Sequence, residues 1–449
     1  MPRPFRRPVS KPWPMPGIMR MSSNPPRWPG GSTASPGSID EPGKRSIAMR
    51  VYHFSEIAYP QAWDAGRAHG SFRVTLNNQL FDPALGGEVI NRHLDEFMLC
   101  DDLGLDIMLN EHHSTATCLN SVVPLLLAIL ARQTKTARLL SLGTPIANRP
   151  DPVRIAEEMA MIDVISRGRL EMGLVKGAPF EIAPANSVAP RMMDRFWEAH
   201  DLILKAMTHA GGPFNWEGEY FHYRQVNIWP RPLQQPHPPV WITALSPDSA
   251  GPIAERRHIV ATLLSGTIAK NLFDAYRRKA SELGWIAGPD RFAYAALIGV
   301  GETEAEGLRR GHLIADYART SPLVAEPFRN PPGYSSIAAN VAALKSGPIG
   351  FVAKVTTRDG KPIDITKATV EEFRAADTVF AGTPDQVYAQ IKDFHDQVGG
   401  FSHLIMMGQG GWLDRKDTEA NLTLFAREVL PRLRELSPIR QAPAIRAAE

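Results

Sequence analysis

The chain has 449 residues, of which 43% are hydrophobic and 22% charged, and its formal net charge is +3. This is ordinary globular usage, and so small a charge over this length argues against a body that binds nucleic acid. The longest apolar run, residues 122–131, is interrupted by Pro124 and is too short to span a bilayer, so we expect no membrane segment. The two cysteines, Cys100 and Cys118, form neither a CxxC motif nor a disulfide framework, which favours a reducing compartment and predicts a cytoplasmic protein.

The N-terminal stretch differs in composition from the rest of the chain. Residues 1–46 are rich in Pro, Arg, Ser and Gly, and they show neither hydrophobic periodicity nor the apolar core of a signal peptide. We expect a disordered basic extension here, with Met49 as an alternative natural start. The folded region is expected over residues 47–437, followed by a short tail at 438–449.

From residue 50 onward the sequence alternates between strand and helix patterns. Short apolar runs predict strands at residues 50–55, 105–109, 137–144, 169–175, 240–245, 258–264, 292–300 and 403–407. Apolar residues at helical spacing predict helices at residues 87–103, 121–134, 152–165, 191–208, 267–283, 302–319, 384–398 and 418–436. Eight strands that alternate with helices favour a closed (β/α)8 barrel, the TIM barrel, over an open sheet.

Two passages interrupt this alternation. Residues 211–239 contain too many Pro and Gly residues for a helix, and we expect short extended segments over one rim. Residues 321–380 contain Pro331-Pro332-Gly333 and a polar, hairpin-like tract at 357–361. We predict that this second passage is an insertion between the seventh and eighth strands and that it serves as a lid.

The second strand is followed directly by polar residues. Its apolar run stops at Glu111, His112 and His113. The C-terminal strand ends of an α/β barrel carry the active site, so these side chains are candidates for chemistry. A polar cluster that only satisfies loop amides is the alternative, and the residues alone do not decide between the two. The histidines are adjacent, so on a strand they point to opposite faces and cannot both bind one metal ion.

Other motifs narrow the classes of function. The sequence has no HExxH, no metal-spaced Cys/His cluster, no GxSxG and no P-loop, so we predict no metal site and disfavour a hydrolase. The nearest approach to GxGxxG, at Gly299, lacks the third glycine, which argues against a built-in Rossmann domain. The helix start at Ser246–Ser249 and the pair Lys176-Gly177 could each hold a phosphate. An ordinary helix cap and a solvated rim lysine are the alternatives.

Four blocks of sequence then point to a family. They are NEHH at 110–113, PLLLAILARQTKTARLLSLGT at 124–144, DPVRIAEEMAMIDVISRGRLEMGLVKG at 151–177 and GTPDQVYAQI at 382–391. In this order they resemble the bacterial luciferase-like family of flavin-dependent monooxygenases over residues 49–437.

The resemblance implies a (β/α)8 barrel with an insertion near the seventh strand. It also implies an oxidoreductase of the FMNH2-dependent monooxygenase type, which acts on paired donors. In such a two-component system a separate flavin reductase supplies reduced FMN, and O2 is used to oxygenate a small organic substrate. Aromatic residues near the expected rim, such as Trp63 and Phe180, suggest that this substrate is hydrophobic. A homodimer is also expected.

The resemblance assigns roles to particular residues. Glu111 and His112 fall on the family's acid and its catalytically important histidine, and Lys176 falls where luciferase has an arginine near the flavin phosphate. The cofactor-binding residues implied in this way are Thr144, Lys176, Leu245, Ser246 and Ser249. The exchange of arginine for lysine loses the bidentate fork, so phosphate binding is expected to differ.

Two local differences from luciferase are expected to matter. Val175 replaces luciferase's reactive cysteine near the flavin, so light emission is not implied. The family has a cis peptide after the third strand, and we expect it before Pro145, where proline would lower its cost.

Two alternatives remain open at this point. A deazaflavin (F420)-dependent oxidoreductase of the same superfamily would need no oxygen. A non-catalytic flavin-binding protein would need no catalytic residues, and the presence of both Glu111 and His112 argues against it.

Overall fold

The computed structural model of the chain describes residues 48–335, 341 and 355–436. The chain divides into two units, Met1–Arg45 and Ser46–Glu449, and every element below belongs to the second unit. The expectations for residues 1–46 and for the tail at 438–449 lie outside the described residues. Within the described residues, no helix combines the length and the apolar character that crossing a membrane requires.

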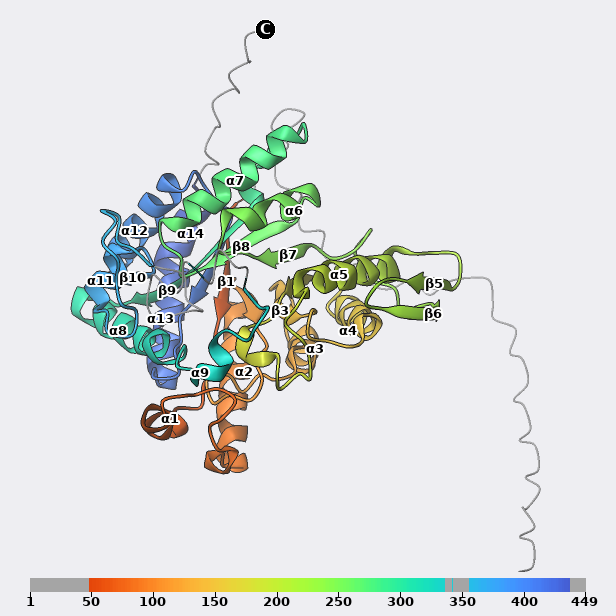
Figure 1. Cartoon of the computed structure of the whole chain (residues 1–449). Helices are drawn as coiled ribbons and strands as arrows, with labels where there is room; N and C mark the ends of the chain where they lie inside the picture. The colour runs from red at the N-terminus through yellow and green to blue at the C-terminus, as the bar shows by residue number, and fades with distance from the viewer. Residues whose placement is uncertain (1–47, 336–340, 342–354, 437–449) are drawn as a thin grey trace, which may run out of the picture. The chain divides into compact units, whose positions relative to one another are not determined.

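Eight parallel strands form a closed ring (Figure 1). In ring order they are β1 Arg50–Phe54, β2 Asp106–Leu109, β3 Leu139–Pro145, β4 Leu170–Val175, β7 Val240–Thr243, β8 Ile259–Leu263, β9 Phe292–Val300 and β11 His403–Met407. The pairing of β8 with β9, and of β11 with both β9 and β1, closes the sheet on itself. The predicted (β/α)8 barrel is therefore confirmed, with each predicted strand in its expected place.

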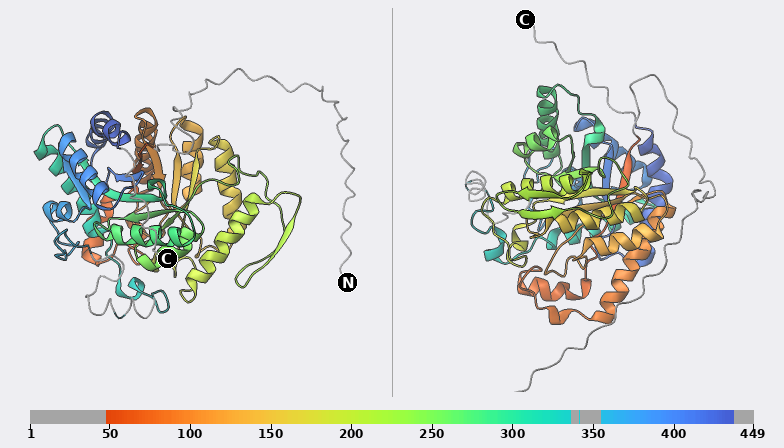
Figure 2. Two further views of the ribbon diagram at one scale, coloured as in Figure 1. Left: turned by 90° about the horizontal axis from the view of Figure 1, so that it is seen from above. Right: turned by 90° about the vertical axis from the view of Figure 1, so that its right-hand side faces the viewer.

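Helices follow the strands and lie outside them, as the view from above shows (left side of Figure 2). The main ones are α2 Pro83–Asp102, α3 Val123–Gln133, α4 Pro152–Ile165, α5 Met192–Thr208, α6 Ala250–Glu255, α7 Ile268–Glu282, α8 Glu304–Thr320 and α12 Pro384–Gln397. The last helix begins as α13 Arg415–Leu424, passes through a π turn at Phe425–Val429 and ends as α14 Leu430–Arg434. Short helices α1 Trp63–His69, α9 Glu326–Arg329 and α11 Val370–Ala375 lie in the connections.

Local sequence explains where several helices begin. Proline occupies the first position of α2, α4 and α12, where its missing N–H costs nothing. Thr383 caps α12 by accepting a hydrogen bond from the amide of Gln386, whose side chain bonds back to the Thr383 amide. This is the cap that the sequence around residue 383 predicts.

Alternate residues of the strands face opposite sides of the barrel wall. Tyr52, Met108 and Trp241 belong to one buried cluster inside the ring. Their neighbours Val51 and Ile107 belong to a second cluster, which includes apolar residues of the surrounding helices. Strands buried on both faces explain why the sequence shows continuous apolar runs instead of alternation.

A polar network fills the N-terminal end of the barrel interior. Glu171 on β4 accepts hydrogen bonds from the Tyr52 hydroxyl at 3.0 Å and from the Trp241 indole at 2.7 Å, and it pairs with Arg138. Arg50 and Asp106 form a bidentate pair with two 2.8 Å bonds across β1 and β2. These contacts join strands that are distant in sequence. We therefore infer that the polar residues at this end of the barrel stabilise the fold.

The insertion lies between β9 and β11, the seventh and eighth strands of the ring, as predicted. Within it, the backbone bridge between Thr356 and Pro362 confirms the hairpin-like tract. One element was not predicted: β10, Val379–Gly382, pairs with the second half of β9, whereas β8 pairs with the first half. Four residues at the end of an irregular passage give too short a pattern to identify a strand.

Three further local expectations can be compared with the structure. The extended segments expected in residues 211–239 are present as β5 Phe214–Glu217 and β6 His222–Val226, an antiparallel pair beside α5 at the right of Figure 1. The helix after Ser246 begins with a 3-10 turn, and α6 has only six residues. The expected cis bond before Pro145 is wrong: the structure has it between Leu142 and Gly143, where the register of β3 against β4 shifts.

Candidate active site

His112 lies just beyond the C-terminal end of β2, between two carboxylates from other strand ends. Its Nδ1 is 2.7 Å from Glu181 Oε1, and its Nε2 is 3.8 Å from Glu56 Oε1. Glu56 follows β1, and Glu181 lies in a 3-10 turn that follows β4. The side chain of His112 is 20% exposed, so the ring is held firmly while one edge stays accessible.

Glu181 orients the His112 ring through the contact at Nδ1. Burial alone would raise the pKa of Glu181, but the nearby His112, the Ala178 amide and Arg73 outweigh this and hold the pKa below its usual range. Glu181 is therefore a carboxylate, which can only accept hydrogen bonds. It can accept a hydrogen bond from the Nδ1–H of His112, which leaves Nε2 to act toward a ligand.

Glu56 is held in turn by Tyr317 of α8. The Tyr317 hydroxyl donates a hydrogen bond to Glu56 Oε2 and lies 3.3 Å from the carbonyl oxygen of Thr117. Burial is the largest cause that raises the pKa of Tyr317 well above its usual range, so the hydroxyl keeps its proton and remains a donor. A chain of contacts therefore runs from α8 through Glu56 to His112 and Glu181.

Glu111 makes a separate set of contacts. Its Oε1 accepts hydrogen bonds from His113 Nε2 at 3.1 Å and from Arg149, and its Oε2 accepts one from the Val123 amide, at the start of α3, at 3.0 Å. Burial would raise its pKa, but the His113 hydrogen bond and the Arg149 charge outweigh this and lower it. The contacts of Glu111 thus favour support of a loop and a helix start, and His113 shares no carboxylate with His112 in these contacts.

Lys176 lies at the end of β4, the strand that also leads to Glu181. Its ammonium is 3.5 Å from the carbonyl oxygen of Tyr334 and 3.5 Å from the centre of the Tyr334 ring. Burial lowers the pKa of Lys176 to about 8. The cation is thus partly removed from water without a carboxylate partner among the ion pairs of the described residues.

A buried amide lies against Gly177, the residue that follows this lysine. Asn148, in the loop after β3, is buried, and neither atom of its amide has a hydrogen-bond partner within the described part of the chain. Gly177 allows this close approach, because a Cβ at Gly177 would lie 2.5 Å from Asn148 Nδ2. Buried amides normally find partners, so an orphaned amide against Gly177, one residue from a lysine without a carboxylate partner in the described residues, fits an anionic group such as a phosphate.

Of the other sequence-predicted cofactor residues, Thr144 lies in β3, and Leu245, Ser246 and Ser249 follow β7; these two strands flank β4. Thr144 is buried, and its hydroxyl is 2.9 Å from the Ser141 hydroxyl, so it is already engaged within β3. Ser246 and Ser249 are exposed, with their hydroxyls 3.2 Å apart, and Leu245 is 42% exposed. Since α6 is so short, its dipole adds little to anion binding at this turn.

Several residues of the site escaped sequence analysis. Glu56 comes two residues after β1, and the rule that identified His112 could also have identified this acid. Glu181, Tyr317 and Tyr334 lie in a 3-10 turn, a helix and the insertion, where no local pattern marks them. Only the closed barrel brings them to the same rim.

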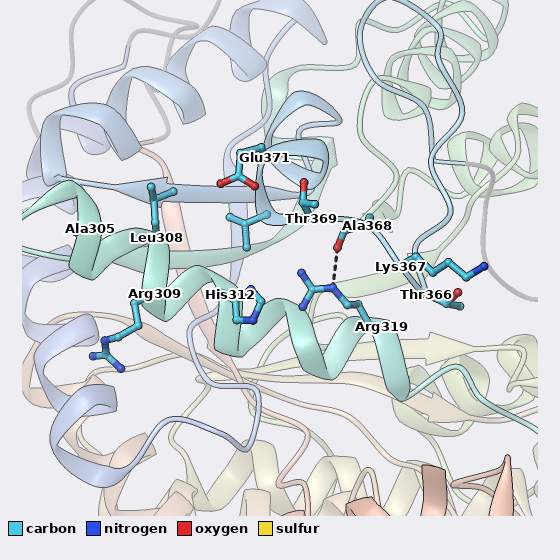
Figure 3. A pocket seen from close by; sticks show the side chains of 11 residues that line it. Ala305, Leu308, Arg309, His312, Arg319, Thr366, Lys367, Ala368, Thr369 and Glu371 are labelled. Atoms are coloured by element: carbon cyan, nitrogen blue, oxygen red, sulfur yellow. Dashed lines mark hydrogen bonds between the residues drawn. The ribbon is translucent and has the colours of Figure 1, made fainter. Parts of the chain in front are cut away.

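A separate hollow of about 700 Å³ lies between α8 and the segment that leads into α11 (Figure 3). Its two arginines already have partners. Arg309 makes two hydrogen bonds to Asp417, at 2.9 and 2.6 Å, and Arg319 donates to the Ala368 carbonyl at 2.7 Å. Because its lining residues, within 305–319 and 366–371, are distinct from the strand-end residues above, we assign it no function.

Fold and site together define a TIM-barrel protein with a histidine–carboxylate pair and a partly buried lysine at its C-terminal rim. Within the described residues, no group of three or more metal-binding side chains could hold a metal ion. The family model of the luciferase-like monooxygenases matches residues 71–399. The chain therefore belongs to the luciferase-like monooxygenase family.

Individual relatives agree with this assignment. The chain is 34% identical over 148 residues to the oxygenase component of the flavin-dependent trigonelline monooxygenase of Acinetobacter baylyi, covering 32% of this chain and 39% of that protein. It is 26% identical over 355 residues to an F420-dependent glucose-6-phosphate dehydrogenase of Amycolatopsis mediterranei, covering 77% and 95%. This chain spans only 57%, 39% and 50% of the lengths of three curated relatives to which it is at least 30% identical.

Solved structures support the same fold. The oxygenating constituent of 3,6-diketocamphane monooxygenase from Pseudomonas putida, in complex with FMN, superposes with a TM-score of 0.64 at 20% identity, covering 88% of this chain and 100% of that one. At this identity the likeness concerns the fold alone.

Proposed function

We propose that this chain is the oxygenase component of a two-component system, which uses reduced FMN and O2 to oxygenate a small hydrophobic organic substrate. The observation that carries the proposal is the placement of Lys176 and the unpaired Asn148 amide on the same rim as the His112–Glu181 pair. Membership of the luciferase-like monooxygenase family supports it. The flavin-dependent trigonelline relative is an oxygenase component, which supports a separate flavin reductase as partner.

In this proposal the bound flavin would supply the oxygen chemistry. The protein would bind and orient the flavin and exclude water from it. Lys176 would hold the phosphate, with Thr144, Leu245, Ser246 and Ser249 lining the same side. His112 would hold or move a proton at Nε2, while Glu181 fixes its other nitrogen. A direct catalytic role for Glu111 stays a prediction, because its carboxylate already supports His113 and α3.

Anaerobic titration with reduced FMN and reduced riboflavin tests the cofactor. We expect FMN to bind more tightly by at least about tenfold, since one charge-assisted phosphate contact contributes roughly 1.5–3 kcal/mol. O2 is then admitted to the protein loaded with reduced FMN, with and without candidate substrates. The protein should consume O2 in both cases, and it should release less peroxide with a substrate that it oxygenates than without one. Equal affinity for the two flavins would exclude a phosphate site at Lys176.

A deazaflavin (F420)-dependent oxidoreductase is the second candidate. The placement of His112 between Glu56 and Glu181 favours it, because a ring that can pass a proton to a neighbouring carboxylate suits oxidation of an alcohol. The similarity to the F420-dependent dehydrogenase over 95% of that protein also supports it. A binding screen of FMN against F420 separates the two candidates, and flavin binding without any turnover would favour a non-catalytic flavin-binding protein.

We further propose that the protein is a cytoplasmic homodimer. Large apolar side chains are exposed along one face of α3 and on the adjacent α4: Val122, Leu125, Ile129, Met161, Val164 and Ile165. An exposed apolar patch on neighbouring helices is typical of a subunit interface. Sedimentation should give a dimer for the parent protein and a monomer for Leu125→Glu, while Ile286→Glu, at an exposed apolar site outside this patch, should leave the dimer intact.

A further inference from the structure

Tyr334, from the insertion, contacts the lysine of the proposed phosphate site. The segment at residues 321–335 crosses from α8 to the end of β4. At one end the amide of Phe72 donates to the Leu323 carbonyl at 3.0 Å. At the other end the Tyr334 hydroxyl donates to the Gly177 carbonyl at 2.9 Å. The ring of Tyr334 is therefore fixed against the strand end that carries Lys176.

The contact between Tyr334 and Lys176 restricts a side chain that is otherwise flexible. The ammonium lies 3.5 Å from the ring centre and 3.5 Å from the carbonyl oxygen of Tyr334. One residue therefore contacts the ammonium through both its ring and its backbone. A lysine ammonium is a point charge on a mobile stem and lacks the preorganised fork of arginine. An aromatic face can supply the missing order, because it attracts a cation without neutralising its charge.

We propose that Tyr334 is a positioning residue of the flavin phosphate site, which holds the Lys176 ammonium oriented and partly desolvated for an incoming phosphate. This inference rests on the proposed function. A desolvated cation attracts an anion more strongly than a hydrated one, and no reorganisation is needed when the phosphate arrives. Burial of the ammonium, which lowers the pKa of Lys176 to about 8, is the cost of this arrangement in the free protein.

Binding measurements on three variants test the role of the ring. Tyr334→Leu should weaken FMN binding by about tenfold and leave riboflavin binding unchanged, a size typical of a desolvated cation–π contact. Tyr334→Phe keeps the ring and should stay within about twofold of the parent. Tyr388→Leu removes a comparable ring, 3.9 Å from Arg432, and should change neither affinity. If Tyr334→Leu binds FMN as tightly as the parent does, or loses both flavins equally, the proposal is wrong.

A second measurement uses the protein without any flavin. The rate of reductive methylation of Lys176, followed by peptide mass spectrometry against pH, reports the fraction of neutral amine. It should be half-maximal near pH 8 in the parent, at higher pH in Tyr334→Leu, and slower when inorganic phosphate is added. An unchanged profile in Tyr334→Leu would overturn the inference even if flavin binds. Failure of every flavin to bind, with the expected methylation profile, would instead overturn the proposed function.

Discussion

His112 is the residue on which turnover should depend most. Replacement by Ala removes the group that can exchange a proton at Nε2, so oxygenation should fall by about 10² to 10⁴, the usual loss for a positioned acid or base. The variant should still fold and bind reduced flavin, although its melting temperature should fall because the 2.7 Å contact with the buried Glu181 is lost. Coupled turnover and peroxide release should be measured together.

His113→Ala is the matched control for this prediction. It should keep most of the turnover but lower the melting temperature, since His113 bonds to the buried Glu111 that supports the start of α3. The assignment of the two rings is reversed if His113→Ala abolishes turnover and His112→Ala retains it.

Lys176 should make flavin binding depend on pH. Its pKa of about 8 means that the ammonium is present below this pH and is lost above it. FMN affinity should therefore fall above pH 8, approaching about tenfold per pH unit, whereas riboflavin affinity should stay level. Lys176→Arg keeps its charge at these pH values, so its FMN affinity should show no such fall. A fall of the same size in the arginine variant would show that another group titrates.

At the scale of elements, a buried histidine pair joins α5 to the start of β8. His200 Nε2 and His258 Nε2 are 2.8 Å apart, so one ring must donate and the other must accept. Burial lowers the pKa of His258 to about 2, and burial also lowers that of His200 despite its bond to Asp201. Both rings are therefore neutral in the folded protein over the usual pH range.

This pair should make stability depend on pH. In the unfolded chain these imidazoles bind protons near pH 6.5, whereas in the folded protein they do not. Their contribution to the free energy of unfolding is therefore complete above pH 6.5 and is lost as the pH falls below it. The free energy of unfolding should drop by up to about 1.4 kcal/mol per pH unit for each imidazole below that value. Urea titrations of the parent and of a His258→Gln variant between pH 7.5 and 5 should show a shallower fall in the variant. Parallel curves would contradict this account.

The order of the elements was the part that sequence predicted best. Strands buried on both faces must be apolar throughout, and helices between them must keep one apolar face, so both patterns survive in the sequence. His112 was predicted because it directly follows such a strand. Its partner Glu181 is 69 residues away in sequence, and the Glu56–Tyr317 pair spans 261 residues. Contacts of this kind depend on closure of the barrel, which no local pattern records.

For the molecule as a whole, Glu171 should be a costly polar residue to remove. It accepts hydrogen bonds inside the ring from Tyr52, Trp241 and Arg138, which belong to three different segments. Glu171→Ala would leave these donors buried and unpaired and should lower the free energy of unfolding by about 3–5 kcal/mol. Urea unfolding measures this loss, and turnover per folded molecule should be unchanged because the network lies at the end opposite the site. A loss below about 1 kcal/mol would show that water replaces the carboxylate.

Strand β9 pairs with a different neighbour along each half of its length. β9 pairs with β8 through its first half and with β10 through its second half, so the chain that leaves β9 after Val300 returns to the same strand at Val379. The backbone hydrogen bonds between the eight strands of the ring do not involve the stretch between these points, so its length and sequence can change while those bonds are kept. Descendants of one ancestral barrel can therefore inherit the wall unchanged while the covering of the rim, Tyr334 included, diverges with the compound that each has to admit.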